Sequence, residues 1–228
     1  MTRRYSWTVR ALFGAAFLYL YFAVYRKPHE PNAFLLLNVF LAYIPVELSF
    51  HINARSSRCV FWGVFFFWLA FYPNAPYMIT DLFHLAKVDP YIYRDNGTRS
   101  GLLLPDLNIW FVFANITMSS LGCLLFGMRS LNDVTLAVMR RFRLRGVGVQ
   151  SVLVLAVTVL ASVGIYLGRF PRLHSADLFL HPGMVFAQLA SAWSPGMVAF
   201  VVLMTALQMA VWILLALAGT TPGENVVE

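Results

Sequence analysis

Long apolar stretches, separated by short polar connections, dominate the chain. Hydropathy predicts about six stretches able to cross a membrane, at about residues 8–25, 33–50, 59–80, 107–128, 150–168 and 195–218. Residues that favour helix starts precede three of them: Asn32, Asp106, and Ser194 followed by Pro195. We therefore predict an all-α fold, a polytopic membrane helical bundle that forms a single integral membrane domain over residues 1–228.

The third apolar stretch contains Pro73 and Pro76. Proline lacks an N–H and crowds the preceding turn, so we expect the third helix to be broken at these two positions. Unpaired backbone survives in hydrocarbon only where protein or water covers it, so the break should face the protein interior or an aqueous pocket. We expect Asn74 to cap a new turn whose free N–H groups can bind an anion.

Composition and charge support a membrane protein. The sequence is 60% hydrophobic and only 12% charged, with a mean hydropathy of +0.69, which is unlike a soluble domain. The net charge is +7, but the basic residues lie at the ends of the apolar stretches rather than on one face, which argues against nucleic-acid binding. An inward N-terminus places ten of the 17 Lys and Arg residues in the cytoplasm, so we predict that both termini are cytoplasmic.

Polar residues gather at the ends of the third and fifth stretches. Asp81 and His84 are three residues apart and share a helix face. At about 1.5 Å per residue, Asp81 lies roughly 30 Å from the start of its helix, and Arg169 reaches a similar depth on the fifth. We therefore expect both groups at the outer membrane interface. The candidate ligand-binding residues are Asn74, Tyr77, Asp81, His84, Arg169, Arg172, His174 and Asp177.

Three functions are compatible with this polar cluster. In the first, Asp81 or Asp177 pairs with Arg169 or Arg172 and only ties two helices together in a structural or accessory subunit. In the second, Arg169 and Arg172 bind the phosphate of an anionic envelope lipid or of a lipid-linked glycan, because guanidinium groups match phosphate geometry. In the third, a metal-dependent hydrolase or transferase acts on such a lipid, with metal ligands drawn from Asp81, His84, His174 and Asp177.

Our working hypothesis is the second function, a protein that binds an anionic head group in a polar pocket at the outer face. It requires no cofactor and no metal, whereas the third function requires a divalent metal. The partners expected are membrane lipids and proteins of envelope biogenesis, and no nucleic acid. The sequence assigns no catalytic residue and no oligomeric state.

Two shorter features give further expectations. Residues 130–145 place apolar side chains at helical spacing and end in four arginines, so they either lie on the cytoplasmic leaflet or extend the fourth helix. Glu47, near the end of the second stretch, is expected to pair with Arg55 or His51.

Several short motifs resemble one bacterial family. They are Tyr72-Pro73-Asn74-Ala75-Pro76-Tyr77, Thr80-Asp81-Leu82-x-His84-Leu85, Gly168-Arg169-Phe170 and Arg172-Leu173-x-Ser175-x-Asp177. With these motifs the chain is similar to the DUF1361 family of polytopic membrane proteins. The resemblance implies a bacterial cytoplasmic (inner) membrane location, and it implies no biochemical activity.

Overall fold

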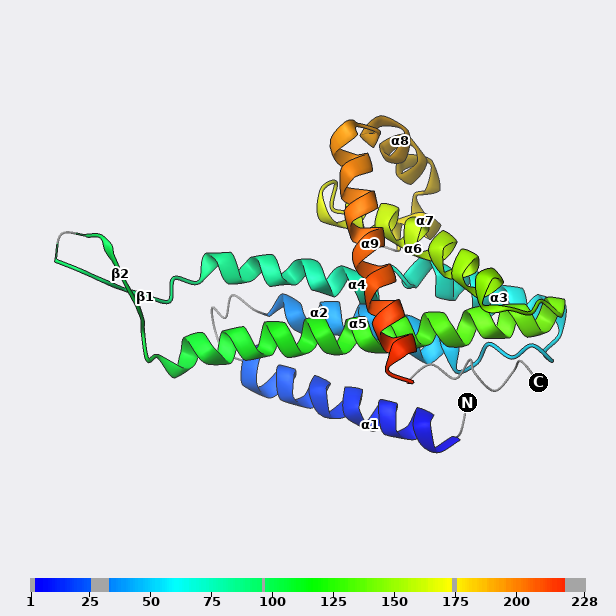
Figure 1. Cartoon of the computed structure of the whole chain (residues 1–228), viewed down its shortest axis with the longest axis horizontal. Helices are drawn as coiled ribbons and strands as arrows, with labels where there is room; N and C mark the ends of the chain where they lie inside the picture. Colours follow the sequence, from blue (N-terminus) through cyan, green and yellow to red (C-terminus); the bar gives the residue numbers. More distant parts are fainter. Residues whose placement is uncertain (1–2, 26–32, 96, 174–175, 220–228) are drawn as a thin grey trace.

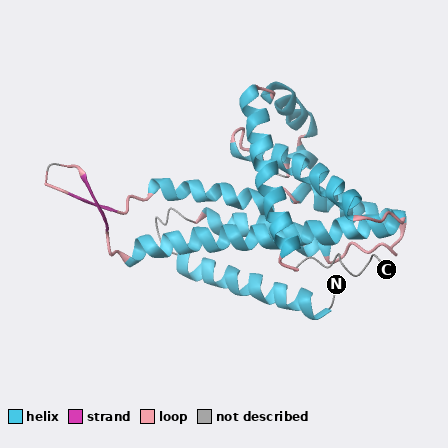
Figure 2. Cartoon of the chain, in the orientation of Figure 1, coloured by secondary structure: helices cyan, strands magenta, loops and turns pink. Residues whose placement is uncertain are grey.

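The computed structural model describes residues 3–25, 33–95, 97–173 and 176–219 (Figure 1). Helices form nearly all of this part of the chain, and its only sheet is a two-stranded hairpin (Figure 2). The elements are α1 (Arg3–Leu20), the π-helical turn η1 (Tyr21–Tyr25), α2 (Phe34–Ser49), α3 (Arg58–Phe71), α4 (Asn74–Tyr77), the 3-10 helix η2 (Met78–Lys87), β1 (Tyr91–Tyr93), β2 (Arg99–Leu103), α5 (Leu107–Phe142), α6 (Val147–Arg169), α7 (Asp177–Leu180), α8 (Pro182–Ala192) and α9 (Pro195–Leu217).

The predicted all-α membrane bundle is confirmed as a fold class. Among the described residues, five helical segments are long and apolar enough to cross a membrane: Arg4–Val24, Arg58–Lys87, Leu107–Phe142, Val147–Arg169 and Pro195–Leu217. The shorter apolar helix α2 covers the remaining predicted stretch. Each predicted stretch therefore contains a helix, and the third and fourth helices extend well beyond the predicted ends.

Two groups of helices make up the molecule. The helices α1, α2, α3 and α5 run along its longest axis, with the hairpin at one end (Figure 1). Helix α6 turns away from them, and α9 packs against α6 and crosses the direction of α5. A polar contact fixes this second pair, because Gln208 Nε2 donates to Ser162 Oγ at 2.9 Å and Ser162 Oγ lies 3.0 Å from Thr205 Oγ1.

Asn74 is the first residue of α4, but its side chain bonds to the end of α3 and does not cap the start of α4. Its side-chain Nδ2 donates to the carbonyl of Phe71 at 2.8 Å, and Phe71 is the last residue of α3. Pro73 occupies the position before α4, where no side chain caps the helix. The expected capping role of Asn74 is therefore wrong. The N–H of Ala75, four residues after Phe71, donates to Tyr72, so the carbonyl of Phe71 has no helical donor and accepts from the Asn74 amide instead.

The break also keeps most of its backbone hydrogen bonds. The N–H of Ala75 donates to the carbonyl of Tyr72 at 3.1 Å, and the N–H of Tyr77 donates to that of Pro73 at 2.9 Å. These groups are not offered to a ligand, which contradicts the expected anion-binding turn. The reason is that the chain stays helical through α4 and η2, so the short turn uses its own donors.

Two glycines let neighbouring helices approach the break closely. A Cβ on Gly127 of α5 would lie 2.6 Å from the Cβ of Ala75, and one on Gly164 of α6 would lie 2.9 Å from the Cγ of Pro73. Contacts this short exclude a side chain at either glycine. Helices α5 and α6 therefore pack directly on the proline segment.

The segment predicted either to lie on the leaflet or to extend the fourth helix is a continuous extension of that helix. Helix α5 runs unbroken to Phe142, and its Leu131 and Val134 belong to a buried apolar cluster that includes Phe61 of α3. The leaflet interpretation is wrong because α2, α3 and α6 cover the apolar face that lipid would have covered. Arg141 instead donates from NH1 to the carbonyls of Ala54 at 2.8 Å and Ser56 at 2.6 Å.

Glu47 has one of its two expected partners. His51 Nε2 lies 3.0 Å from Glu47 Oε1, as predicted, but the cation that pairs with this carboxylate is Arg10 of α1, at 2.5 Å. The Tyr43 hydroxyl also donates to Glu47, at 2.6 Å. The expectation of Arg55 came from nearness along the chain, whereas packing of α1 on α2 brings in a residue 37 positions away.

Candidate functional site

A cavity of about 970 Å³ lies beside the proline break. Its walls come from α2, from α3 through η2, from the second half of α6 and from the α7–α8 segment. Six of the eight predicted site residues line it, and they are Asn74, Tyr77, Asp81, His84, Arg169 and Arg172. The structure thus brings together the residues that follow the break and those at the end of α6.

Asp81 is the buried acid of the cavity, with its side chain only 1% exposed. Its Oδ2 accepts a hydrogen bond from Asn38 Nδ2 at 2.7 Å, and its Oδ1 lies 3.5 Å from Arg169 NH1. Oδ1 is buried and accepts no hydrogen bond from the described residues. The carboxylate therefore joins three elements, η2, α2 and α6, and pairs with Arg169 through charge rather than through a hydrogen bond.

His84 lies on the same face of η2 as Asp81. Its Nδ1 is 3.1 Å from the backbone carbonyl of Asp81 and 3.8 Å from the Oδ1 of that residue. Its ring stacks on Phe34 of α2, with 4.2 Å between the ring centroids. The carbonyl and the phenyl ring hold the imidazole in place, and its side chain remains 21% exposed at the cavity.

Arg172 follows the end of α6, where the chain reverses. Its backbone is left-handed, with φ of 61°, and the next residue, Leu173, donates from its N–H to the carbonyl of Leu167 at 3.1 Å. A left-handed conformation is unfavourable for a residue with a Cβ, so this local geometry has an energetic cost that the surrounding contacts offset. The turn brings an exposed arginine to the cavity, beside the partly buried Arg169.

Most of the chain matches the profile of one protein family. The profile of a family described as "Protein of unknown function (DUF1361)" matches residues 37–211. The chain belongs to the DUF1361 family. No curated protein and no solved structure matches it significantly. The predicted membership is thus confirmed, and the description assigns no activity to DUF1361 proteins.

The match to DUF1361 covers the polar part of the cavity. The matched range contains Asn38 of α2, the segment from the proline break to Asp81 and His84, and both arginines at the end of α6. The site therefore lies within the part of the chain that defines its family membership, whereas Phe34, which stacks on His84, lies just before it.

The two remaining predicted residues add no metal ligand to the cavity in the part of the chain that the structure describes. His174 lies outside the described residues. Asp177 begins α7 and is not among the residues that line the cavity. Within the described part of the chain, no group of three or more His, Cys, Asp and Glu side chains is arranged to hold a metal ion.

Sequence reasoning missed two polar residues of the cavity. Asn38 donates to Asp81 from the middle of α2, and Lys87 adds a third cationic side chain at the end of η2. A polar amide inside an apolar stretch was a usable signal for Asn38, because such a group needs a partner on another helix. Lys87 follows His84 by three residues, so the same helix-face argument applied to it.

Proposed function

We propose that this protein binds the phosphate-bearing head group of an anionic lipid in the cavity beside the proline break. The observation that carries the proposal is an excess of positive charge. Lys87, Arg169 and Arg172 line the cavity together with one carboxylate among the described residues, that of Asp81, which is buried and already accepts from Asn38. The cavity therefore attracts an anion.

The cationic side chains of the cavity suit the oxygen atoms of a phosphate group. Arginine presents several N–H donors in a planar fork that matches phosphate, and lysine adds a mobile point charge. Asp81 faces Arg169 at 3.5 Å without hydrogen-bond geometry, so the donors of Arg169 remain available to a second acceptor. In this scheme Asp81 positions Arg169, and a ligand phosphate supplies the hydrogen bonds that the carboxylate does not.

The same proposal assigns a location. We place the protein in a bacterial cytoplasmic membrane, with both termini in the cytoplasm and the cavity at the outer face. Supporting this placement, Arg55, Arg58 and the arginines from Arg140 to Arg145 lie at the ends of α3 and α5 that the sequence assigns to the cytoplasm. Lys87, at the opposite end of the third helix, lines the cavity.

Native mass spectrometry of the protein purified in detergent without chelator tests the proposal. We expect a specific anionic lipid to co-purify with the native protein and to be lost from Arg172→Gln. Arg145→Gln is the matched control, because Arg145 is an exposed arginine in the turn between α5 and α6. Equal retention of the same lipid by all three folded proteins would show that the arginine site does not bind it.

Two other outcomes would favour the competing functions. A stoichiometric metal that is removed by EDTA together with ligand binding would favour a metal-dependent hydrolase or transferase. Absence of both lipid and metal, with Arg172→Gln and Arg169→Gln only lowering stability, would favour a structural or accessory subunit. An envelope-biogenesis protein recovered with the native protein would then identify the partner.

A further inference from the structure

The cavity has two chemically different halves. Its polar half contains Asp81, His84 and the cations at the ends of η2 and α6. Its other half is apolar. Its walls come from α3, α6, α7 and α8 and include Phe66, Leu69, Leu160, Phe179 and Phe186. A site for a small inorganic anion needs only the first half.

The apolar half is open to the surroundings of the helices rather than closed by them. Three of its wall residues remain largely exposed: Phe66 of α3 at 60%, Leu160 of α6 at 55% and Phe186 of α8 at 64%. Helices α3 and α6 both belong to segments apolar enough to cross a membrane. Exposed apolar side chains on such helices face hydrocarbon, so the cavity opens sideways toward the bilayer.

We infer that the apolar half is a subsite for a hydrocarbon chain, and that the ligand is a membrane-resident phosphate lipid which enters between α3 and α8. This inference rests on the proposed function, because the phosphate of the same lipid occupies the arginine half. The chain lies along α3 and α6, in contact with Phe66, Leu69 and Leu160.

The volume of the cavity excludes a free phosphate or a small sugar phosphate as the full occupant. A cavity of about 970 Å³ lies at the upper end of the range of roughly 300–1,000 Å³ for sites that enclose drug-sized ligands. A small anion would leave the apolar half unfilled by the ligand, whereas the hydrocarbon chain of a lipid can enter it directly from the bilayer toward which it opens. Because the chain comes from hydrocarbon and not from water, its gain is the sum of many small van der Waals contacts with the cavity wall.

The wall formed by α7 and α8 is held to the bundle by aromatic contacts. Phe179 of α7 stacks on Phe67 of α3, with 5.3 Å between ring centroids, and lies 6.4 Å from Phe71. No residue of α7 or α8 is buried. The wall of α7 and α8 therefore touches α3 over a small area only. The rest of the wall borders the cavity, where a hydrocarbon chain can lie between α8 and α3.

Binding measurements with three probes test the inference. In detergent, we would measure the affinity of dioleoyl phosphatidic acid, dihexanoyl phosphatidic acid and glycerol 3-phosphate for the native protein and for Phe186→Asn. Partition into micelles is the same for both proteins, so the ratio of their affinities reports the subsite. We expect Phe186→Asn to bind the dioleoyl lipid about tenfold more weakly and to bind glycerol 3-phosphate equally well.

The controls separate the inference from the function on which it rests. Phe111→Asn changes a phenylalanine of similar exposure, 59%, on α5 outside the cavity lining and should leave all three affinities unchanged. Equal affinity of native protein and Phe186→Asn for the dioleoyl lipid, with binding still lost in Arg172→Gln, would overturn the chain subsite alone. Unchanged dioleoyl binding in Arg172→Gln would overturn the head-group site itself.

Discussion

Asp81 is the residue on which the geometry of the site depends. It is 0% exposed, and its two oxygens face Asn38 of α2 and Arg169 of α6. A buried carboxylate is expensive to desolvate and is retained only where partners compensate for that cost. Its arrangement fixes Arg169 at the cavity, so Asp81 acts as a positioning residue.

Replacing this carboxylate should destabilise the protein in a way that its neighbour can reverse. We expect Asp81→Asn to lower the free energy of unfolding by about 1–3 kcal/mol, because Arg169 loses its partner while remaining partly buried. The double variant Asp81→Asn with Asn38→Asp restores one carboxylate and one amide to the pair, and we expect it to recover most of this loss. Thermal unfolding in detergent measures both, at about 2–4 °C for each kcal/mol. A double variant less stable than Asp81→Asn would contradict this assignment.

Gly127 should tolerate no side chain, because of one specific contact. Gly127→Ala places a methyl group 2.6 Å from the Cβ of Ala75, and overpacking of this kind costs about 1–3 kcal/mol. Gly122→Ala, on the same helix with nothing within 4 Å of the added methyl, should not destabilise the protein. Thermal unfolding of both variants measures the difference.

A compensating change identifies the contact responsible. Ala75→Gly removes the methyl group that Gly127→Ala would strike, and the next nearest atoms are 3.8 Å away. We therefore expect the double variant to be more stable than Gly127→Ala alone, despite the helix-propensity cost of about 1 kcal/mol for a glycine at position 75. If the double variant loses the full sum of the two single changes, the packing of α5 on the break is not the cause.

At the scale of the elements, the sequence predicted which segments are helical better than what they pack against. Hydrophobic composition defined the apolar stretches, but the end of α5 lies outside any apolar run because Arg129 and Asp133 interrupt it. These two side chains pair with each other at 3.2 Å, which lets a charged segment continue a buried helix. Composition alone did not distinguish such a segment from one lying on a leaflet.

The extension of α5 should depend on Arg141. This side chain donates to two backbone carbonyls, at Ala54 and Ser56, in the connection between α2 and α3. Arg141→Ala leaves both without that donor, and we expect a loss of about 1–3 kcal/mol and faster amide hydrogen exchange over residues 50–57. Arg140→Ala, at the exposed neighbouring position, is the control and should change neither quantity. Equal exchange in the two variants would rule out this role of Arg141.

The candidate site shows the same limit on prediction from sequence. Counting residues along each helix gave the depth of Asp81 and Arg169, and these two residues meet in the structure. The depth of a residue in the membrane does not give the direction in which its helix face points. The contact of Asn38 with Asp81 was therefore missed, and so was the contact of Arg10 with Glu47. Contacts between helices far apart in sequence are set by packing, which a single sequence does not display.

At the scale of the whole molecule, the membrane topology of the chain depends on whether α2 crosses the bilayer. Its 16 residues cover about 24 Å, less than the roughly 30 Å of a hydrocarbon core. Within the bundle it is held by Ser130 of α5, whose Oγ donates to the carbonyl of Pro45 and accepts from Trp68 Nε1 of α3. A helix surrounded in this way crosses the membrane only if the bilayer thins or its flanking residues reach outward.

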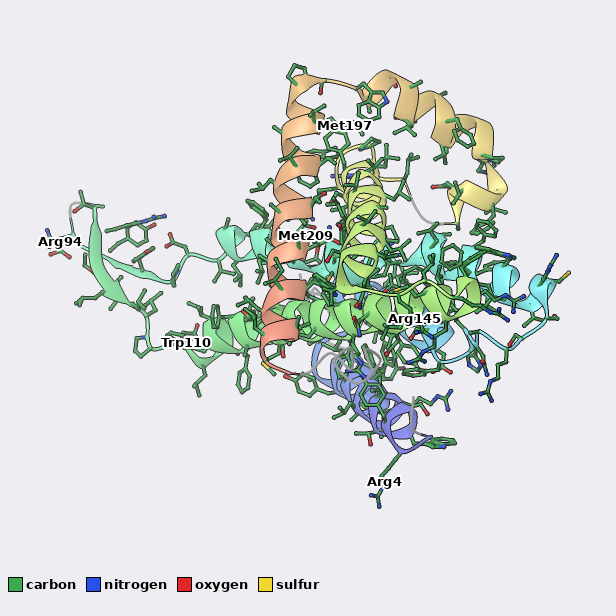
Figure 3. All side chains as sticks on the ribbon, turned by 45° about the vertical axis from the view of Figure 1, so that its right-hand side comes forward. Arg4, Arg94, Trp110, Arg145, Met197 and Met209 are labelled. Carbon is green, nitrogen blue, oxygen red and sulfur yellow. The ribbon has the colours of Figure 1, made fainter. Side chains whose placement is uncertain are left out.

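The side on which each loop lies tests whether α2 crosses. If it does, the start of α1 and the hairpin lie on opposite sides of the membrane; if it does not, they lie on the same side. Arg4, Arg94 and Arg145 mark the start of α1, the hairpin and the turn between α5 and α6 (Figure 3). In a background of Cys59→Ser and Cys123→Ala, we expect a membrane-impermeant maleimide to label Arg94→Cys in intact cells, and to label Arg4→Cys and Arg145→Cys only after permeabilisation.

Arg145→Cys serves as the internal reference in this experiment, because α5 alone separates it from the hairpin. Labelling of Arg4→Cys together with Arg94→Cys in intact cells would mean that α2 does not cross, and would remove the cytoplasmic N-terminus from the proposed topology. Labelling of Arg4→Cys and Arg145→Cys, but not of Arg94→Cys, in intact cells would invert the orientation and move the cavity to the cytoplasmic face. Labelling of Arg145→Cys alone would mean that α2 does not cross while the N-terminus stays cytoplasmic, and it would place the cavity at the same face. A head-group site there would draw its lipid from the inner leaflet, so the topology also decides which lipids the binding experiments should include.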